Sequence, residues 1–168
     1  MPSSKAKQDY LDTCDREHAI TMKVLRAYPE EKLDLRPHPK SKSARELAWV
    51  FVLERGLGTM VWHDHFAKGQ AMGEAPKPPE AWSDILAACE KAHADFRALV
   101  AGASEADLEQ KISFFVAPKT MGQISRWEWI WFLLHDEIHH RGQFSVYLRL
   151  AGAKVPSIYG PSADEPWM

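Results

Sequence analysis

Residues 127–150 constrain the fold of this chain more than any other stretch. The almost wholly apolar segment "WEWIWFLL" (127–134) runs directly into "HDEIHHRGQ" (135–143). Histidine, acidic and arginine side chains are costly to bury unless they have partners. The stretch continues to Leu150, and Gly152 is suited to end a helix there. The pattern therefore predicts one long helix whose polar middle meets partner groups on neighbouring helices.

Apolar periodicity and end signals predict three further helices. We expect them at residues 5–27, 43–65 and 79–102. No strand pattern is recognised, and a Pro- and Gly-rich tail follows residue 153. Four helices joined by loops of moderate length predict an all-α four-helix bundle, with residues 1–168 forming a single domain.

Capping boxes mark where two of these helices begin. Ser43 and Glu46 form such a box before the second helix. Before the last helix two boxes compete, one that begins at Thr120 and one that begins at Ser125. The sequence leaves both starting points open.

Composition limits the classes of function. The chain is 45% hydrophobic and 26% charged, and its net charge is -2. We therefore expect no nucleic-acid partner and no anionic membrane partner. The N-terminal segment "MPSSKAKQDY" lacks the apolar core of a signal peptide, and no apolar run approaches the ~20 residues of a membrane span. We expect a cytoplasmic protein in which Cys14 and Cys89 are free thiols.

Helical spacing indicates which polar groups of residues 135–143 face inward. Asp136 and His140 are i,i+4 neighbours, and their face continues into apolar residues at both ends. His135 and His139 form a second i,i+4 pair, on a face that mixes polar and apolar residues. We therefore expect Asp136 and His140 to face the centre of the bundle.

Glu54 is the partner that the second helix offers. It is a lone carboxylate on an apolar stripe, and such a group is costly to bury unless it is paired or binds a metal. In one interpretation an arginine, Arg55 or Arg141, forms a buried ion pair with it. In the other, Glu54, Asp136 and His140 hold a divalent metal such as Zn, Ni, Fe or Mn. The stripe comprises Leu47, Val50, Phe51, either Leu57 or Gly58, and Val61.

Two segments resemble a known superfamily. "HHRGQFSVYLRLAGAKVPSIYGPS" resembles the last helix and tail of the DinB/YfiT-like superfamily, and "LRPHPKSKSARELAW" resembles its approach to the second helix. The resemblance implies a four-helix bundle, usually up-down-down-up and often a homodimer. It also implies a metal held by one side chain of the second helix and an i,i+4 pair of the last helix. His140, directly before Arg-Gly-Gln, matches one ligand, and Asp136 is its partner.

One position departs from this pattern. Members of the superfamily usually have a histidine near the position of Val50, and Glu54 lies one turn later. Either Glu54 substitutes for that histidine, or the site is degraded and metal-free. In the second case the chain is a non-catalytic dimeric bundle.

The resemblance also implies chemistry on small molecules. Members include mycothiol- and bacillithiol-dependent enzymes and maleylpyruvate isomerases. We expect a metal-dependent enzyme, of the thiol S-transferase or isomerase type or a hydrolase, whose cofactors are a divalent metal and a low-molecular-weight thiol. His139, Glu137 or His135 would orient a ligand or carry a proton. Arg141 would bind a substrate carboxylate, or else form a structural ion pair with a neighbouring helix.

Overall fold

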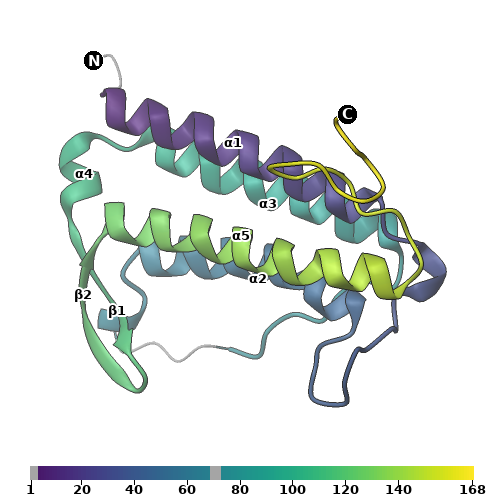
Figure 1. The fold of residues 1–168 in the computed structure, drawn as a ribbon. Coiled ribbons are helices and arrows are strands. Elements are labelled where there is room, and N and C mark those ends of the chain that lie inside the picture. The colour runs from purple at the N-terminus through teal and green to yellow at the C-terminus, as the bar shows by residue number, and fades with distance from the viewer. Residues whose placement is uncertain (1–3, 69–72) are drawn as a thin grey trace.

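Four long helices build the molecule, and the computed structural model describes residues 4–68 and 73–168 of the chain. Figure 1 shows that α1 and α5 run in one direction and that α2 and α3 run in the other. The helices α1 and α2 each pack against both α3 and α5. The all-α four-helix bundle is therefore confirmed, with the up-down-down-up order that the resemblance implies. The helices are α1 (Lys5–Arg26), α2 (Ala44–Trp62), α3 (Trp82–Gly102) and α5 (Arg126–Leu150).

Capping explains where α2 and α5 begin. The Ser43 hydroxyl accepts a hydrogen bond from the backbone N–H of Glu46, whose carboxylate accepts one from the backbone N–H of Ser43. Ser125 forms the same reciprocal box at the start of α5. The competing residue Thr120 lies in a strand, so the later of the two predicted starts is correct. Gly152 follows α5 with a φ of 78°, the left-handed conformation expected of a glycine that ends a helix.

The third helix begins later than expected. The sequence placed its start near Pro79, whereas α3 begins at Trp82. Ala81 is still extended, with a ψ of 131°, and it provides no side-chain cap. Residues 69–72 of the expected loop before α3 lie outside the described residues.

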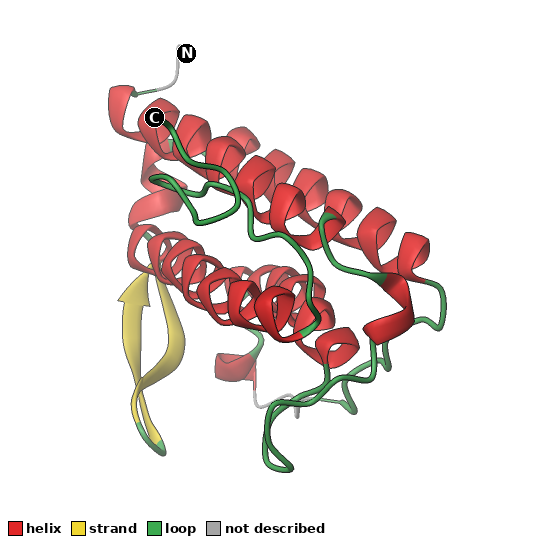
Figure 2. Ribbon diagram, turned by 45° about the vertical axis from the view of Figure 1, so that its right-hand side comes forward, coloured by secondary structure: helices red, strands yellow, loops and turns green. Residues whose placement is uncertain are grey.

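A two-stranded sheet, which the sequence did not predict, precedes α5 (Figure 2). The short helix α4 (Glu105–Glu109) leads into β1 (Lys111–Ala117), which pairs antiparallel with β2 (Thr120–Ser125). Ile112 is buried, but most other residues of the two strands are partly or fully exposed. The expectation of no strand was therefore wrong, because these strands bury too little surface to produce a clear alternation of apolar and polar residues.

The core has two apolar clusters, one near each end of the bundle. Buried polar residues lie between them along the helices. They connect three helices, because Arg55 of α2 pairs with Glu137 of α5 and Arg141 of α5 pairs with Glu17 of α1. These residues, called the polar layer below, are Glu17, Thr21, Glu54, Arg55, His93, Glu137 and Arg141.

The remaining expectations on the fold concern the tail and the cysteines. The tail lies along α1 and α5, held by ion pairs from Lys23 to Glu165 at 2.8 Å and from Arg149 to Asp164 at 2.6 Å. Both cysteines are buried free thiols, as expected. Within the described ranges, no helix combines the length and apolar character that crossing a bilayer requires.

Candidate metal centre

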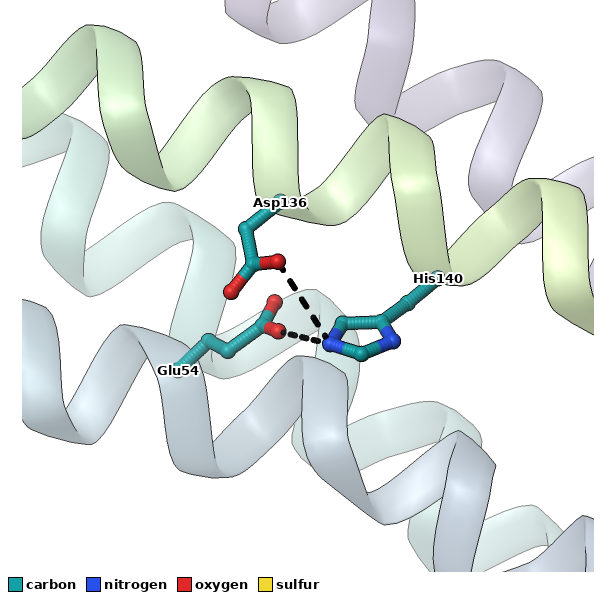
Figure 3. A group of neighbouring side chains, drawn as sticks. All are labelled: Glu54, Asp136 and His140. Carbon is teal, nitrogen blue, oxygen red and sulfur yellow. Dashed lines mark ion pairs between the residues drawn. The ribbon is translucent and has the colours of Figure 1, made fainter. Parts of the chain in front are cut away.

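Three side chains that can bind a metal converge between α2 and α5 (Figure 3). Glu54 comes from α2, and Asp136 and His140 come from α5. Each offers one ligand atom, and these atoms all lie within 4.8 Å of one another. Nε2 of His140 lies 2.9 Å from Oε1 of Glu54 and 3.6 Å from Oδ1 of Asp136. The structure thus brings together the three residues that the sequence singled out, and no other such group occurs in residues 4–68 and 73–168.

The position of this group differs from the prediction in one respect. Asp136 and His140 are half-buried and face α2, whereas the most deeply buried polar residues of the motif are Glu137 and Arg141, which are 4% and 1% exposed. The physical reason is that α5 packs against both α1 and α2, so two adjoining faces of the helix are covered. The sequence placed the metal-binding face at the centre, and the structure places it at the contact between α2 and α5.

Burial and like charge act on the Glu54 carboxyl. Burial raises its pKa to about 7, and the neighbouring Asp136 carboxylate adds to the rise, while His140 opposes it. The Glu54 carboxylate in turn raises the pKa of His140 to about 9. Two carboxylates that face one imidazole therefore make this point favourable for positive charge.

The residues present fit a divalent metal. Oε1 of Glu54 is buried and receives no well-directed hydrogen bond from the described residues, although Nε2 of His140 lies 2.9 Å away. A buried oxygen in that situation is costly unless a cation or a donor satisfies it. Two carboxylates and one imidazole form a ligand set that Zn, Ni, Fe and Mn accept, with coordination positions left open.

Gln143 orients His140, and the sequence did not single it out. Its amide oxygen lies 3.0 Å from Nδ1 of His140, and its amide nitrogen lies 2.9 Å from Nε2 of His139. An amide oxygen only accepts hydrogen bonds, so Nδ1 carries the proton and Nε2 faces the carboxylates. The i,i+3 spacing from His140 was the available signal. His139 itself is exposed and contacts the centre through Gln143.

The two arginines that the sequence offered as partners of Glu54 pair with other glutamates. Arg55 pairs with Glu137, and Arg141 pairs with Glu17 at 2.7 Å. Arg141 is almost fully buried, so its geometry supports the structural ion pair that the sequence had left open. His135 is exposed and is not part of the group of three.

The chain is similar to known proteins over most of its length. A family model described as the DinB family matches residues 1–167. The uncharacterized protein YrdA of Bacillus subtilis (strain 168) is 28% identical over 157 residues, which cover 93% of this chain and 89% of that protein.

Two solved structures share the fold. A DinB-like protein from Bacillus cereus has a TM-score of 0.75 at 23% identity, with 90% of this chain and 97% of that chain covered. A DinB-like protein from Bacillus subtilis has a TM-score of 0.67 at 16% identity, with 89% and 97% covered.

Proposed function

Because the chain belongs to the DinB family, we propose that it is an enzyme that uses a divalent metal to act on a small molecule. One observation carries the proposal. The ligand atoms of Glu54, Asp136 and His140 lie within 4.8 Å of one another, and an oxygen of Glu54 is buried without a well-directed hydrogen bond from the described residues. Such a group stabilises a bound cation.

The chain's own residues have distinct roles in this proposal. Glu54, Asp136 and Nε2 of His140 hold the metal, and Gln143 keeps the ring of His140 in the tautomer that can bind it. His139 is exposed beside Gln143 and exchanges protons with solvent or substrate. When bound, the metal supplies Lewis-acid chemistry, which lowers the pKa of a thiol or of water. The reaction is thiol-dependent transfer or isomerisation, with a low-molecular-weight thiol as cofactor, or hydrolysis.

Metal binding by the purified chain tests this proposal. Titration with Zn, Ni, Mn and Fe(II), followed by calorimetry and elemental analysis, is expected to show one equivalent bound at the group of three. His140→Ala removes a ligand and is expected to abolish that binding. His135→Ala is the matched control, because it removes an exposed histidine of the same helix outside the group. Equal metal binding by the two variants would contradict the proposed ligand set.

A non-catalytic, metal-free bundle is the second candidate. The observation that favours it is Val50, which stands where the family usually has a histidine. In that case no metal raises the melting temperature, and the ion pair of His140 with Glu54 at 2.9 Å only stabilises the fold.

We also propose a homodimer. Large apolar side chains on α5 support it, since Phe132, Val146 and Leu150 are 48%, 55% and 54% exposed. A second copy of the chain would remove these side chains from water. Sedimentation equilibrium is expected to give twice the chain mass of 19.1 kDa.

A further inference from the structure

A cleft beside the candidate metal centre has room for the rest of a substrate. Its volume is about 490 Å³, and it lies between residues 37–42 and the C-terminal half of α5. His140 and Gln143 line one part of it, so the cleft and the centre share the His140 side chain. A ligand in this cleft would therefore lie next to the group of three.

The cleft is lined by basic side chains and by no acidic side chain. Lys40 and Lys42 line it, and no acidic residue does. Both lysines are exposed, and neither has an ion-pair partner among the residues that the structure describes. By contrast, Arg36 of the same segment pairs with Glu46 at 2.9 Å. The two ammonium groups thus remain available to a ligand.

A hydrogen bond anchors the lysine segment to α5. The Tyr147 hydroxyl donates a hydrogen bond of 2.8 Å to the backbone carbonyl of Lys42, which fixes the lysine segment against the helix. Tyr147 follows His140 by two helical turns, a rise of roughly 10 Å. The lysine segment is therefore anchored to α5 on the C-terminal side of the candidate metal centre.

We infer that Lys40 and Lys42 bind an anionic group, a carboxylate or a phosphate, of the small molecule on which the centre acts. Lysine suits this role because its ammonium is a point charge on a flexible stem, which accepts anions of either shape. The reaction part of this inference rests on the proposed function, whereas anion binding in the cleft does not require the metal. The sequence offered Arg141 as the residue that binds a substrate carboxylate. Because Arg141 is buried in an ion pair with Glu17, we assign that role to Lys40 and Lys42.

Anion binding by the metal-free full chain tests the inference. Succinate and inorganic phosphate are titrated at low salt while the amide signals of Gln143 and Tyr147 are followed by NMR, with neutral succinamide as the comparison ligand. We expect saturable shifts with at least one anion, weaker binding at high salt, and no binding of succinamide. The better of the two anions identifies the anionic group that is preferred.

Paired variants locate the binding site. Lys40→Gln/Lys42→Gln is expected to weaken anion binding by roughly five- to tenfold, the effect of losing two partly screened charge interactions. The control Lys119→Gln/Lys154→Gln changes the net charge equally, but its residues lie in the hairpin turn and the tail, outside the cleft. Equal weakening in both pairs, saturable binding of succinamide, or no anion-dependent shift would overturn the inference.

The outcome separates this inference from the proposed function. If anions bind at the cleft and the chain takes up no metal, the anion-binding inference is supported and the proposed metal-dependent function is contradicted. If metal binds at the group of three and no anion shifts the amide signals of Gln143 and Tyr147, the inference of an anionic substrate is contradicted and the proposed metal centre is supported.

Discussion

Gln143 decides which nitrogen of His140 is presented to the two carboxylates. Its amide oxygen holds Nδ1 at 3.0 Å, so Gln143→Ala releases the ring from that tautomer and orientation. Loss of a group that orients a metal ligand typically weakens metal affinity about 10- to 100-fold. We expect a loss of that size for Zn by calorimetry, and little loss for Gln143→Glu, which keeps an acceptor oxygen. Wild-type affinity in the alanine variant would show that Gln143 does not position the ligand.

His93 makes the fold sensitive to acid. Burial, and then the neighbouring side chains of His18 and Arg55, lower the pKa of His93 from 6.5 to about 4. In the window between those values the unfolded chain binds more protons than the folded chain, so the free energy of unfolding falls as the pH falls. His93→Phe keeps a ring stacked on His18, which lies 3.8 Å away between centroids, and removes the titration.

Urea unfolding at several pH values between 7 and 4 measures this effect. The stability of His93→Phe is expected to decline less steeply toward acid than that of the wild type. His38→Phe, at an exposed loop histidine, is the control substitution. If the wild type and His93→Phe decline in parallel, His93 does not carry the acid sensitivity.

At the residue scale, the sequence singled out three residues that the structure brings together, but it misplaced their setting. The i,i+4 spacing predicted that Asp136 and His140 share one face of α5, and the apolar stripe of α2 singled out Glu54. Glu137 and Arg141 are also i,i+4 neighbours, so spacing alone does not rank the two faces of α5. Only the packing of α5 against both α1 and α2 decides that Glu137 and Arg141 occupy the centre.

At the scale of elements, two glycines of α2 differ in what surrounds them. A Cβ at Gly58 would lie 2.8 Å from Cδ1 of Leu133 and 2.9 Å from Cε2 of Phe96, whereas a Cβ at Gly56 would meet nothing within 4 Å. Gly58→Ala therefore overpacks the contact between α2 and its neighbours and is expected to cost about 1–3 kcal/mol. Gly56→Ala is expected to stabilise the protein by about 0.5–1 kcal/mol, because glycine is a poor helix former.

Thermal and urea unfolding of the two glycine variants provide the measurement. Because both substitutions lie in one helix and are chemically identical, their helix propensities cancel in the comparison. A Gly58→Ala variant as stable as Gly56→Ala would mean that Leu133 and Phe96 move aside at no cost.

The helices were predictable because their signals are local. The capping box of Ser43 with Glu46 and the positive φ of Gly152 both follow from a few neighbouring residues. The hairpin of β1 and β2 was not predictable, because it is held by pairing between strands and by contacts outside it. One such contact is the hydrogen bond that the backbone N–H of Ser113 donates to the Asp64 carboxylate at 2.8 Å.

At the scale of the whole molecule, the polar layer divides the core and connects its helices. Arg55 and Glu137 join α2 to α5, and the Thr21 hydroxyl of α1 donates a 2.7 Å hydrogen bond to the same Glu137 carboxylate. A purely apolar middle would bury more apolar surface, so the layer is not explained by stability alone. It includes Glu54, and its Arg55–Glu137 pair holds α2 and α5 at the spacing that brings the three candidate ligands together.

This layer predicts a strong coupling between Arg55 and Glu137. Glu137→Leu leaves the Arg55 guanidinium buried without its carboxylate, and breaking a buried pair in this way costs about 3–5 kcal/mol. Arg55→Leu/Glu137→Leu removes both charges, so its cost is expected to be well below the sum of the two single variants. Urea unfolding of the four proteins forms the double-mutant cycle that measures the coupling.

The exposed pair Lys91 and Asp95, at 2.6 Å on α3, is the control for burial. Asp95→Leu is expected to change the free energy of unfolding little, since solvent screens that pair. Additive costs in the Arg55 and Glu137 cycle would mean that the two side chains act independently. The polar layer would then not set the spacing of α2 and α5, and metal binding should survive in the double variant. With the predicted coupling, the double variant is expected to remain folded but to bind metal more weakly, because the frame around Glu54 is no longer held.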